Sequence, residues 1–216
     1  MTMNTRNHRA LLAGAVALAS LLAAGPAGAA PITTSNLAES MDQTNWAAWQ
    51  ATSFTTDADF YLLDNVKLKL SLFEDGGTNQ VFIYDDENGH PGSLLPNGEL
   101  SGSFVGWPNV STYTPTGDVS LAPNTTYWVI NLSTLWSGGP EPHIFWHLTA
   151  SSAQSGPWGI GTYAFGPDGD TWTDIPGYAG MFSVSATPVS DVPEPATLTL
   201  AGLAMLGALL RPRRRR

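Results

Sequence analysis

The chain has 216 residues, a formal net charge of −9 and no cysteine. Without cysteine, thiol catalysis and cysteine-ligated metal sites are excluded. Between positions 30 and 191 the sequence holds 17 acidic residues against two lysines, Lys67 and Lys69, a formal charge of −15. Nucleic acid and anionic membrane surfaces are poor partners for such a body. The charge favours solubility outside the cell, and binding of cations or neutral polysaccharide is the alternative.

The N-terminal segment has the pattern of a secretory signal peptide. It consists of the basic stretch MTMNTRNHR, the apolar stretch ALLAGAVALASLLAAG and the small residues of AGAAP. We predict a signal peptide over residues 1–29, cut by signal peptidase between Ala29 and Ala30, with Ala27 and Ala29 at the small-residue positions. A cut after Ala30 would place a proline next to the scissile bond. A permanent N-terminal membrane anchor is the alternative.

Residues 30–190 show the two-residue periodicity of β-strands. Turn residues separate the strands, and no helix is expected apart from a short turn near Met41 to Gln50. The pattern predicts an exported all-β domain, an antiparallel β-sandwich or jelly roll. The residues expected to share buried faces are Val66, Leu68, Leu70 and Leu72; Trp128, Ile130 and Leu132; Ile144, Trp146 and Leu148; and Phe182, Val184 and Ala186.

Two acidic loops carry the hard oxygen ligands that calcium prefers. DDENG contains Asp85 and Asp86, and DGDTWTD contains Asp168, Asp170 and Asp174. Ordinary turns are the alternative, because Asp, Asn and Gly are turn residues.

Recognisable catalytic motifs are missing from the sequence. His143 and His147 are four residues apart but lack the glutamate of a His-Glu-x-x-His zinc site, and the Gly-x-Ser-x-Gly elbow of serine hydrolases is absent. We therefore expect neither an enzyme nor a cofactor.

Four of the eight tryptophans lie within two residues of Gly, Pro or Asp in expected loops: Trp107, Trp136, Trp158 and Trp172. Loop tryptophans on a β-sandwich can stack on sugar rings. Capping the ends of the sandwich is the alternative role.

Three stretches between Phe54 and Ser133 resemble the choice-of-anchor R domain of exported bacterial proteins. They are FTTDADFYLLDNVKLKL, VFIYDDENGHPGSLL and LAPNTTYWVINLS. This family is defined by its varied surface anchors and has no established molecular activity, so the resemblance implies export and display but assigns no site residue.

The C-terminal segment VPEPATLTLAGLAMLGALLRPRRRR joins a Pro-Glu-Pro corner, an apolar run and an arginine block. As a helix, the run 196–210 reaches about 22 Å at roughly 1.5 Å per residue, whereas a bilayer core measures about 30 Å. The arginines of 211–216 should stay on the cytoplasmic side. A short transient membrane segment is predicted, with a buried core helix as the alternative.

These three parts, in this order over residues 191–216, resemble the PEP-CTERM sorting signal of Gram-negative bacteria. The resemblance implies that Val192, Pro193, Glu194 and Pro195 form the motif read by a membrane-embedded exosortase. It also implies display on the cell surface or release, in company with exopolysaccharide and biofilm production.

The sequence therefore predicts an exported, non-catalytic protein of the cell surface or extracellular matrix, anchored transiently in the inner membrane. Signal peptidase and exosortase are the expected processing partners, and nucleic acid is not expected. The alternative function is a carbohydrate-binding module that uses loop tryptophans and is assisted by calcium.

Overall fold

The computed structural model describes residues 29–45, 47–72, 78–105, 109–134 and 144–189. Ala30–Val189 form one compact unit. Among the described residues there is no helix long and apolar enough to cross a membrane. Residues 1–28 of the expected signal peptide, the sorting motif 192–195, the hydrophobic run 196–210 and the arginine tail lie outside the described residues, as do Trp107, Trp136 and His143.

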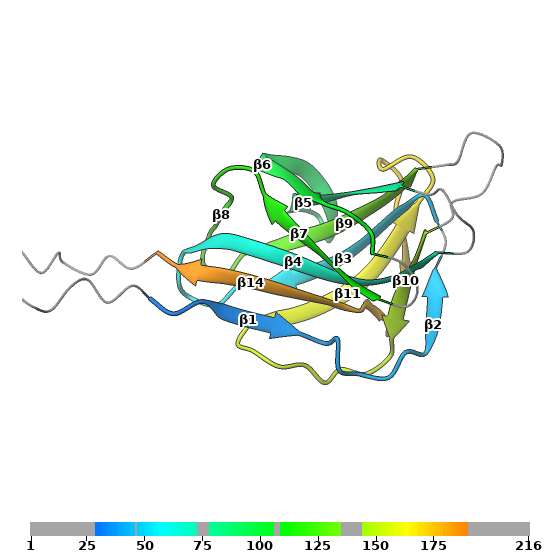
Figure 1. Ribbon diagram of the computed structural model, residues 1–216, viewed down its shortest axis with the longest axis horizontal. Coiled ribbons are helices and arrows are strands. Elements are labelled where there is room, and N and C mark those ends of the chain that lie inside the picture. The colour runs from blue at the N-terminus through cyan, green and yellow to red at the C-terminus, as the bar shows by residue number, and fades with distance from the viewer. Residues whose placement is uncertain (1–28, 46, 73–77, 106–108, 135–143, 190–216) are drawn as a thin grey trace, which may run out of the picture. The chain divides into compact units, whose positions relative to one another are not determined.

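All regular structure described in the compact unit is β-strand (Figure 1). In chain order the strands are β1 (Ile32–Ser35), β2 (Gln43–Asn45), β3 (Trp49–Thr55), β4 (Tyr61–Leu72), β5 (Thr78–Glu87), β6 (His90–Gly102), β7 (Asn109–Pro115), β8 (Ser120–Leu121), β9 (Thr126–Thr134), β10 (Ile144–Thr149), β11 (Gly159–Gly166), β12 (Thr173–Ile175), β13 (Ala179–Gly180) and β14 (Phe182–Pro188).

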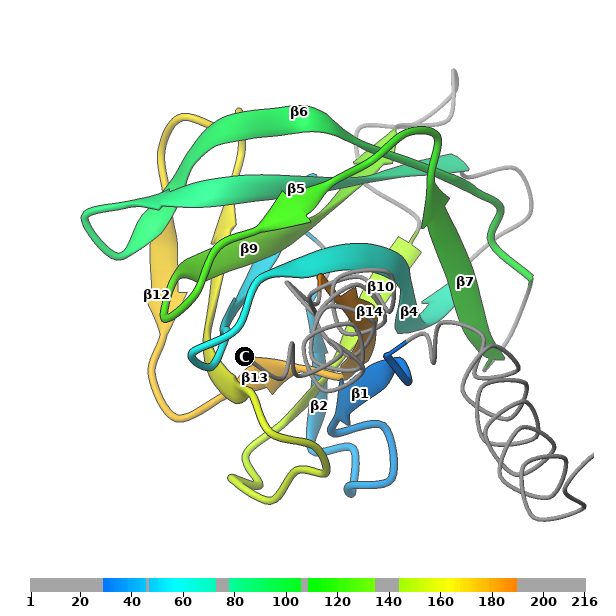
Figure 2. The same cartoon turned by 90° about the vertical axis from the view of Figure 1, so that its left-hand side faces the viewer.

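The strands form one antiparallel sheet that curls back on itself. Its main order is β1-β14-β4-β7-β6-β5-β9-β3-β11-β12, and β10 joins β4 to β2 and β13. In Figure 2, β6, β5 and β9 cross the top of the unit while β1, β2 and β13 lie at the bottom. The predicted antiparallel all-β class is confirmed, and the opposing layers belong to one continuous sheet.

The main core lies inside the curl and follows the predicted alternation on three strands. Of the four residues expected on β4, three are fully buried and Leu72 packs against the core from a partly exposed position. Burying each large apolar side chain contributes about 1.5–3 kcal/mol. The fully buried residues on β4, β10 and β14 are Val66, Leu68, Leu70, Ile144, Trp146, Leu148, Phe182, Val184 and Ala186.

Buried polar side chains join strands where the sheet closes. The Gln50 amide donates to the carbonyl of Ile144 (3.1 Å) and accepts from the backbone N–H of Trp146 (3.0 Å), so it links β3 to β10. β2 also pairs with β10. In place of the short helical turn expected near Met41 to Gln50, the segment contains β2 and the start of β3, because pairing with β10 and β9 holds these residues in strands.

Buried tyrosines make the fold sensitive to alkali. Burial, together with the hydrogen bond donated to Asp57 (2.8 Å), raises the pKa of Tyr61 to about 12. Burial raises the pKa of Tyr163 well above the ordinary value of 10.0. The folded state thus retains protons that the unfolded chain releases above that pH.

We expect the free energy of unfolding to be independent of these tyrosines below pH 10 and to fall as pH rises above it. Chemical unfolding at a series of pH values, recorded with tyrosinate absorbance, measures this effect. Full tyrosinate absorbance just above pH 10 in a protein that is still folded would contradict it.

Candidate functional site

A second apolar cluster covers the outer face of β5, β9, β3 and β11. Strand alternation sends Val81 and Val129 into the main core and sends their neighbours outward. The register aligns Phe82, Ile130, Ala51 and Ala164 in one row across the four strands. Three side chains of this row are fully buried, although they lie on the face away from the main core: Ala51, Ile130 and Ala164.

Aromatic side chains lie over this row. We call Trp49, Phe82, Tyr84, Trp128 and Trp172 the aromatic face. Trp128 is buried, and the other four side chains are partly exposed. The rings of Trp49 and Phe82 are nearly parallel, with centroids 6.5 Å apart and planes 20° apart. The ring of Tyr84 stands at 76° to that of Phe82. The result is a partly exposed apolar surface supported by a packed base.

The turn between β5 and β6 borders the aromatic face on one side. Asp86 Oδ1 accepts from Nε1 of Trp128 (2.8 Å), and Asp86 Oδ2 accepts from the Gly89 N–H (3.1 Å). The Asp85 carboxylate accepts from the backbone N–H of Ser93. These bonds fix the Trp128 indole and close the turn.

The hairpin between β11 and β12 borders the other side. Asp168 Oδ1 accepts from the backbone N–H groups of Thr171 (2.9 Å) and Asp170 (3.1 Å), and these bonds lower the pKa of the Asp168 carboxyl. Gly169 has a φ of +84° and lies against the Trp49 ring, where an added Cβ would be 2.9 Å from Cε2. Glycine therefore satisfies both the backbone conformation and the close approach at this position.

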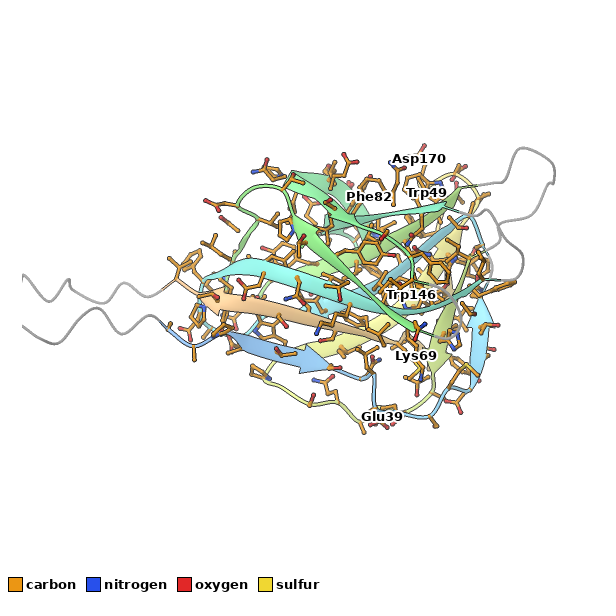
Figure 3. The ribbon with its side chains drawn as sticks, viewed as in Figure 1. Glu39, Trp49, Lys69, Phe82, Trp146 and Asp170 are labelled. Atoms are coloured by element: carbon orange, nitrogen blue, oxygen red, sulfur yellow. The ribbon has the colours of Figure 1, made fainter. Side chains whose placement is uncertain are left out.

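β6 and β12, the strands that follow the two bordering loops, make one contact. His90 Nε2 lies 3.3 Å from Asp174 Oδ1. Burial raises the pKa of Tyr84, and the nearby Asp170 carboxylate raises it further. Figure 3 shows Trp49, Phe82 and Asp170 along the same edge of the unit, with Glu39 on the opposite edge. The structure thus places the two predicted acidic loops and Trp172 at one surface.

The acidic residues predicted as calcium ligands act mainly in turns and contacts. Asp85, Asp86 and Asp168 accept from N–H groups, and Asp174 faces His90. The described part of the chain holds no group of three His, Asp or Glu side chains placed to bind a metal ion. Asp86 and Asp168 therefore have the turn-forming role that the turn interpretation predicts, and calcium binding at these loops stays a prediction.

Trp158 requires a correction. It is 1% exposed and belongs to the main core, so it cannot contact a surface-bound sugar. Its ring stacks on Phe54 (5.5 Å, 12°) and meets Tyr61 edge-on (4.9 Å, 79°). The preceding loop turns inward because Ser155 pairs with Ser35 and the Trp158 N–H donates to Thr34 Oγ1 (3.1 Å).

Three members of the aromatic face were missed from the sequence: Trp49, Phe82 and Tyr84. A usable signal was present in VFIY, where Phe82 and Tyr84 alternate with the core residues Val81 and Ile83. Aromatic residues on the face that alternation assigns to solvent indicate either a second packing layer or a binding surface.

A groove of about 410 Å³ with a mixed polar and apolar lining lies between the 149–154 segment and Tyr178. Many of its polar groups are already paired with protein groups. Ser151 Oγ donates to Glu39 (2.6 Å), and Asp42 accepts from the Ala150 N–H (2.6 Å). The groove is therefore a weaker candidate than the aromatic face, which offers exposed ring surface.

Comparison with known families identifies the C-terminal segment. The PEP-CTERM protein-sorting motif matches residues 191–215. The predicted sorting signal is confirmed, and the matched range contains Val192, Pro193, Glu194 and Pro195. This motif marks an exported protein that is processed by an exosortase and associates transiently with the membrane. The resemblance of residues 54–133 to the choice-of-anchor R domain is not confirmed. No curated protein gives a significant match to the chain.

Proposed function

We propose that the protein is a non-catalytic component of the cell surface or extracellular matrix, where it associates with exopolysaccharide. The observation that carries this proposal is the sorting motif at residues 191–215. A formal charge of −15 over positions 30–191 supports a solvated role outside the cell. Several of the described carboxylates already accept hydrogen bonds from backbone N–H groups in turns. Because they have this structural role, they favour a display protein over an enzyme.

The geometry of the compact unit supports display. β1 pairs with β14 so that Ile32 faces Ala186, which places both ends of the unit at one end of the sheet (Figure 1). Trp49 and Asp170 lie toward the other end in the same view (Figure 3). Trp49 and Asp170 therefore lie away from the end of the sheet at which the two ends of the compact unit meet.

Carbohydrate binding by the domain itself is a second candidate function, favoured by the aromatic face. Half-buried aromatic rings beside carboxylates match the two surfaces of a sugar, an apolar ring face and a polar rim. Of the tryptophans first considered for this role, Trp172 alone is both described and part of the aromatic face.

We expect the sorted protein to fractionate with the exopolysaccharide of its host and to release no sugars from it. Cell-surface and matrix fractions are prepared from a host with an exosortase, and the protein is traced by immunoblotting before and after the polysaccharide is removed. Incubation of the purified protein with the same polysaccharide, followed by a reducing-end assay, tests turnover. Uniform recovery in the free medium would contradict the association, and new reducing ends would contradict the non-catalytic role.

A further inference from the structure

We propose that the aromatic face binds the pyranose rings of a neutral polysaccharide, with Trp49, Phe82 and Tyr84 as stacking surfaces and Asp170 as a hydrogen-bond acceptor for sugar hydroxyls. This inference rests on the second candidate function, carbohydrate binding by the domain, and specifies its site and ligand class.

The ring arrangement suits a sugar chain lying across the sheet. Trp49 and Phe82 form a stacked pair with centroids 6.5 Å apart and planes 20° apart, and both side chains are partly exposed at the outer face of the sheet. The ring of Tyr84 stands at 76° to that of Phe82, with centroids 6.3 Å apart, and is also partly exposed. Sugar rings have apolar faces that stack on aromatic rings and polar rims that require hydrogen-bonding partners.

The base beneath the rings is rigid. Ile130 and Ala51 are fully buried, and the Trp128 indole is held by Asp86 at 2.8 Å. Gly169 packs directly against the Trp49 ring. Because these contacts fix the rings before a ligand arrives, binding loses less conformational entropy than it would on mobile side chains.

The charges around the aromatic face select against acidic sugars. The two bordering loops carry Asp85, Asp86, Asp168, Asp170 and Asp174. Lys67 and Lys69 lie on β4, outside these loops. Uronate-rich chains would meet like charges here, whereas carboxylates readily accept hydrogen bonds from neutral hydroxyls.

The test is native affinity electrophoresis of the purified processed protein. The gels contain the neutral fraction of the host's exopolysaccharide, hydroxyethylcellulose as a defined neutral glucan, or alginate as a uronate chain. The double variant Trp49→Leu/Phe82→Leu removes both rings while keeping apolar volume over Ile130. Phe60→Ala is the matched control, because Phe60 is an exposed aromatic residue (58%) outside the aromatic face.

We expect the neutral host fraction to retard the parent and Phe60→Ala equally. We expect the affinity of the double variant for this fraction to be lower by a factor of about ten at least. Circular dichroism and thermal unfolding verify that the variants are folded; should the double variant unfold, Phe82→Leu alone is compared with the parent. Equal retardation of parent and aromatic variant would overturn the site, and stronger retardation by alginate would overturn the ligand class. A parent that no polysaccharide retards would overturn carbohydrate binding itself, while leaving exosortase sorting unaffected.

Discussion

A variant with alanine at Pro193, Glu194 and Pro195 is expected to accumulate unprocessed in the inner membrane, whereas the parent loses its tail. The run 196–210 is fifteen uncharged residues long, too short for a comfortable permanent span, and the arginines are expected to hold its end on the cytoplasmic side. Two prolines fix φ and prevent the helix from continuing through the motif. Alanine has the highest helix propensity, so the variant lets the helix extend and removes the corner that the exosortase reads.

Intact-mass spectrometry of fractionated membranes, in a host that has an exosortase, measures the processing of this variant. Pro188→Ala is the matched control, because this proline ends β14 and lies outside the matched residues 191–215. Trimming and sorting of the triple variant to the same extent as the parent would show that the tail acts as a simple anchor.

The alternation of apolar residues predicted which side chains enter the main core on strands that have only one buried face. On β4, polar residues such as Lys67 separate Val66, Leu68 and Leu70, so the buried side is evident. On β9 the pattern is ambiguous, because both faces are buried. Val129 enters the main core, and Trp128 enters the outer cluster beneath a hairpin that lies about forty residues further along the chain. Local periodicity contains no information about such a distant covering segment.

The candidate site was predicted only in parts for a related reason. The sequence identified both acidic loops and Trp172, because Asp, Asn and Gly form turns through contacts with neighbouring residues in the chain. Their placement at one surface depends on the strand order β5-β9-β3-β11, which is set by long-range pairing. Composition also assigned Trp158 to a loop because of its Gly and Pro neighbours. Neighbouring residues indicate an irregular backbone, but they do not indicate whether the side chain points outward or into the core.

Trp158→Ala is expected to destabilise the folded domain by about 3–5 kcal/mol, the usual cost of removing a large buried aromatic side chain. The Trp158 ring fills space between Phe54 and Tyr61, and adjacent strands can close only part of the cavity that its removal leaves. Since domains of this kind are stable by about 5–15 kcal/mol in total, the loss is a large share of the stability. Denaturant unfolding of parent and variant measures it, with Trp172→Ala as the comparison, because Trp172 is partly exposed and should cost less. A Trp158 variant that keeps parental stability and instead loses polysaccharide binding would return Trp158 to the surface role that its sequence neighbours first suggested.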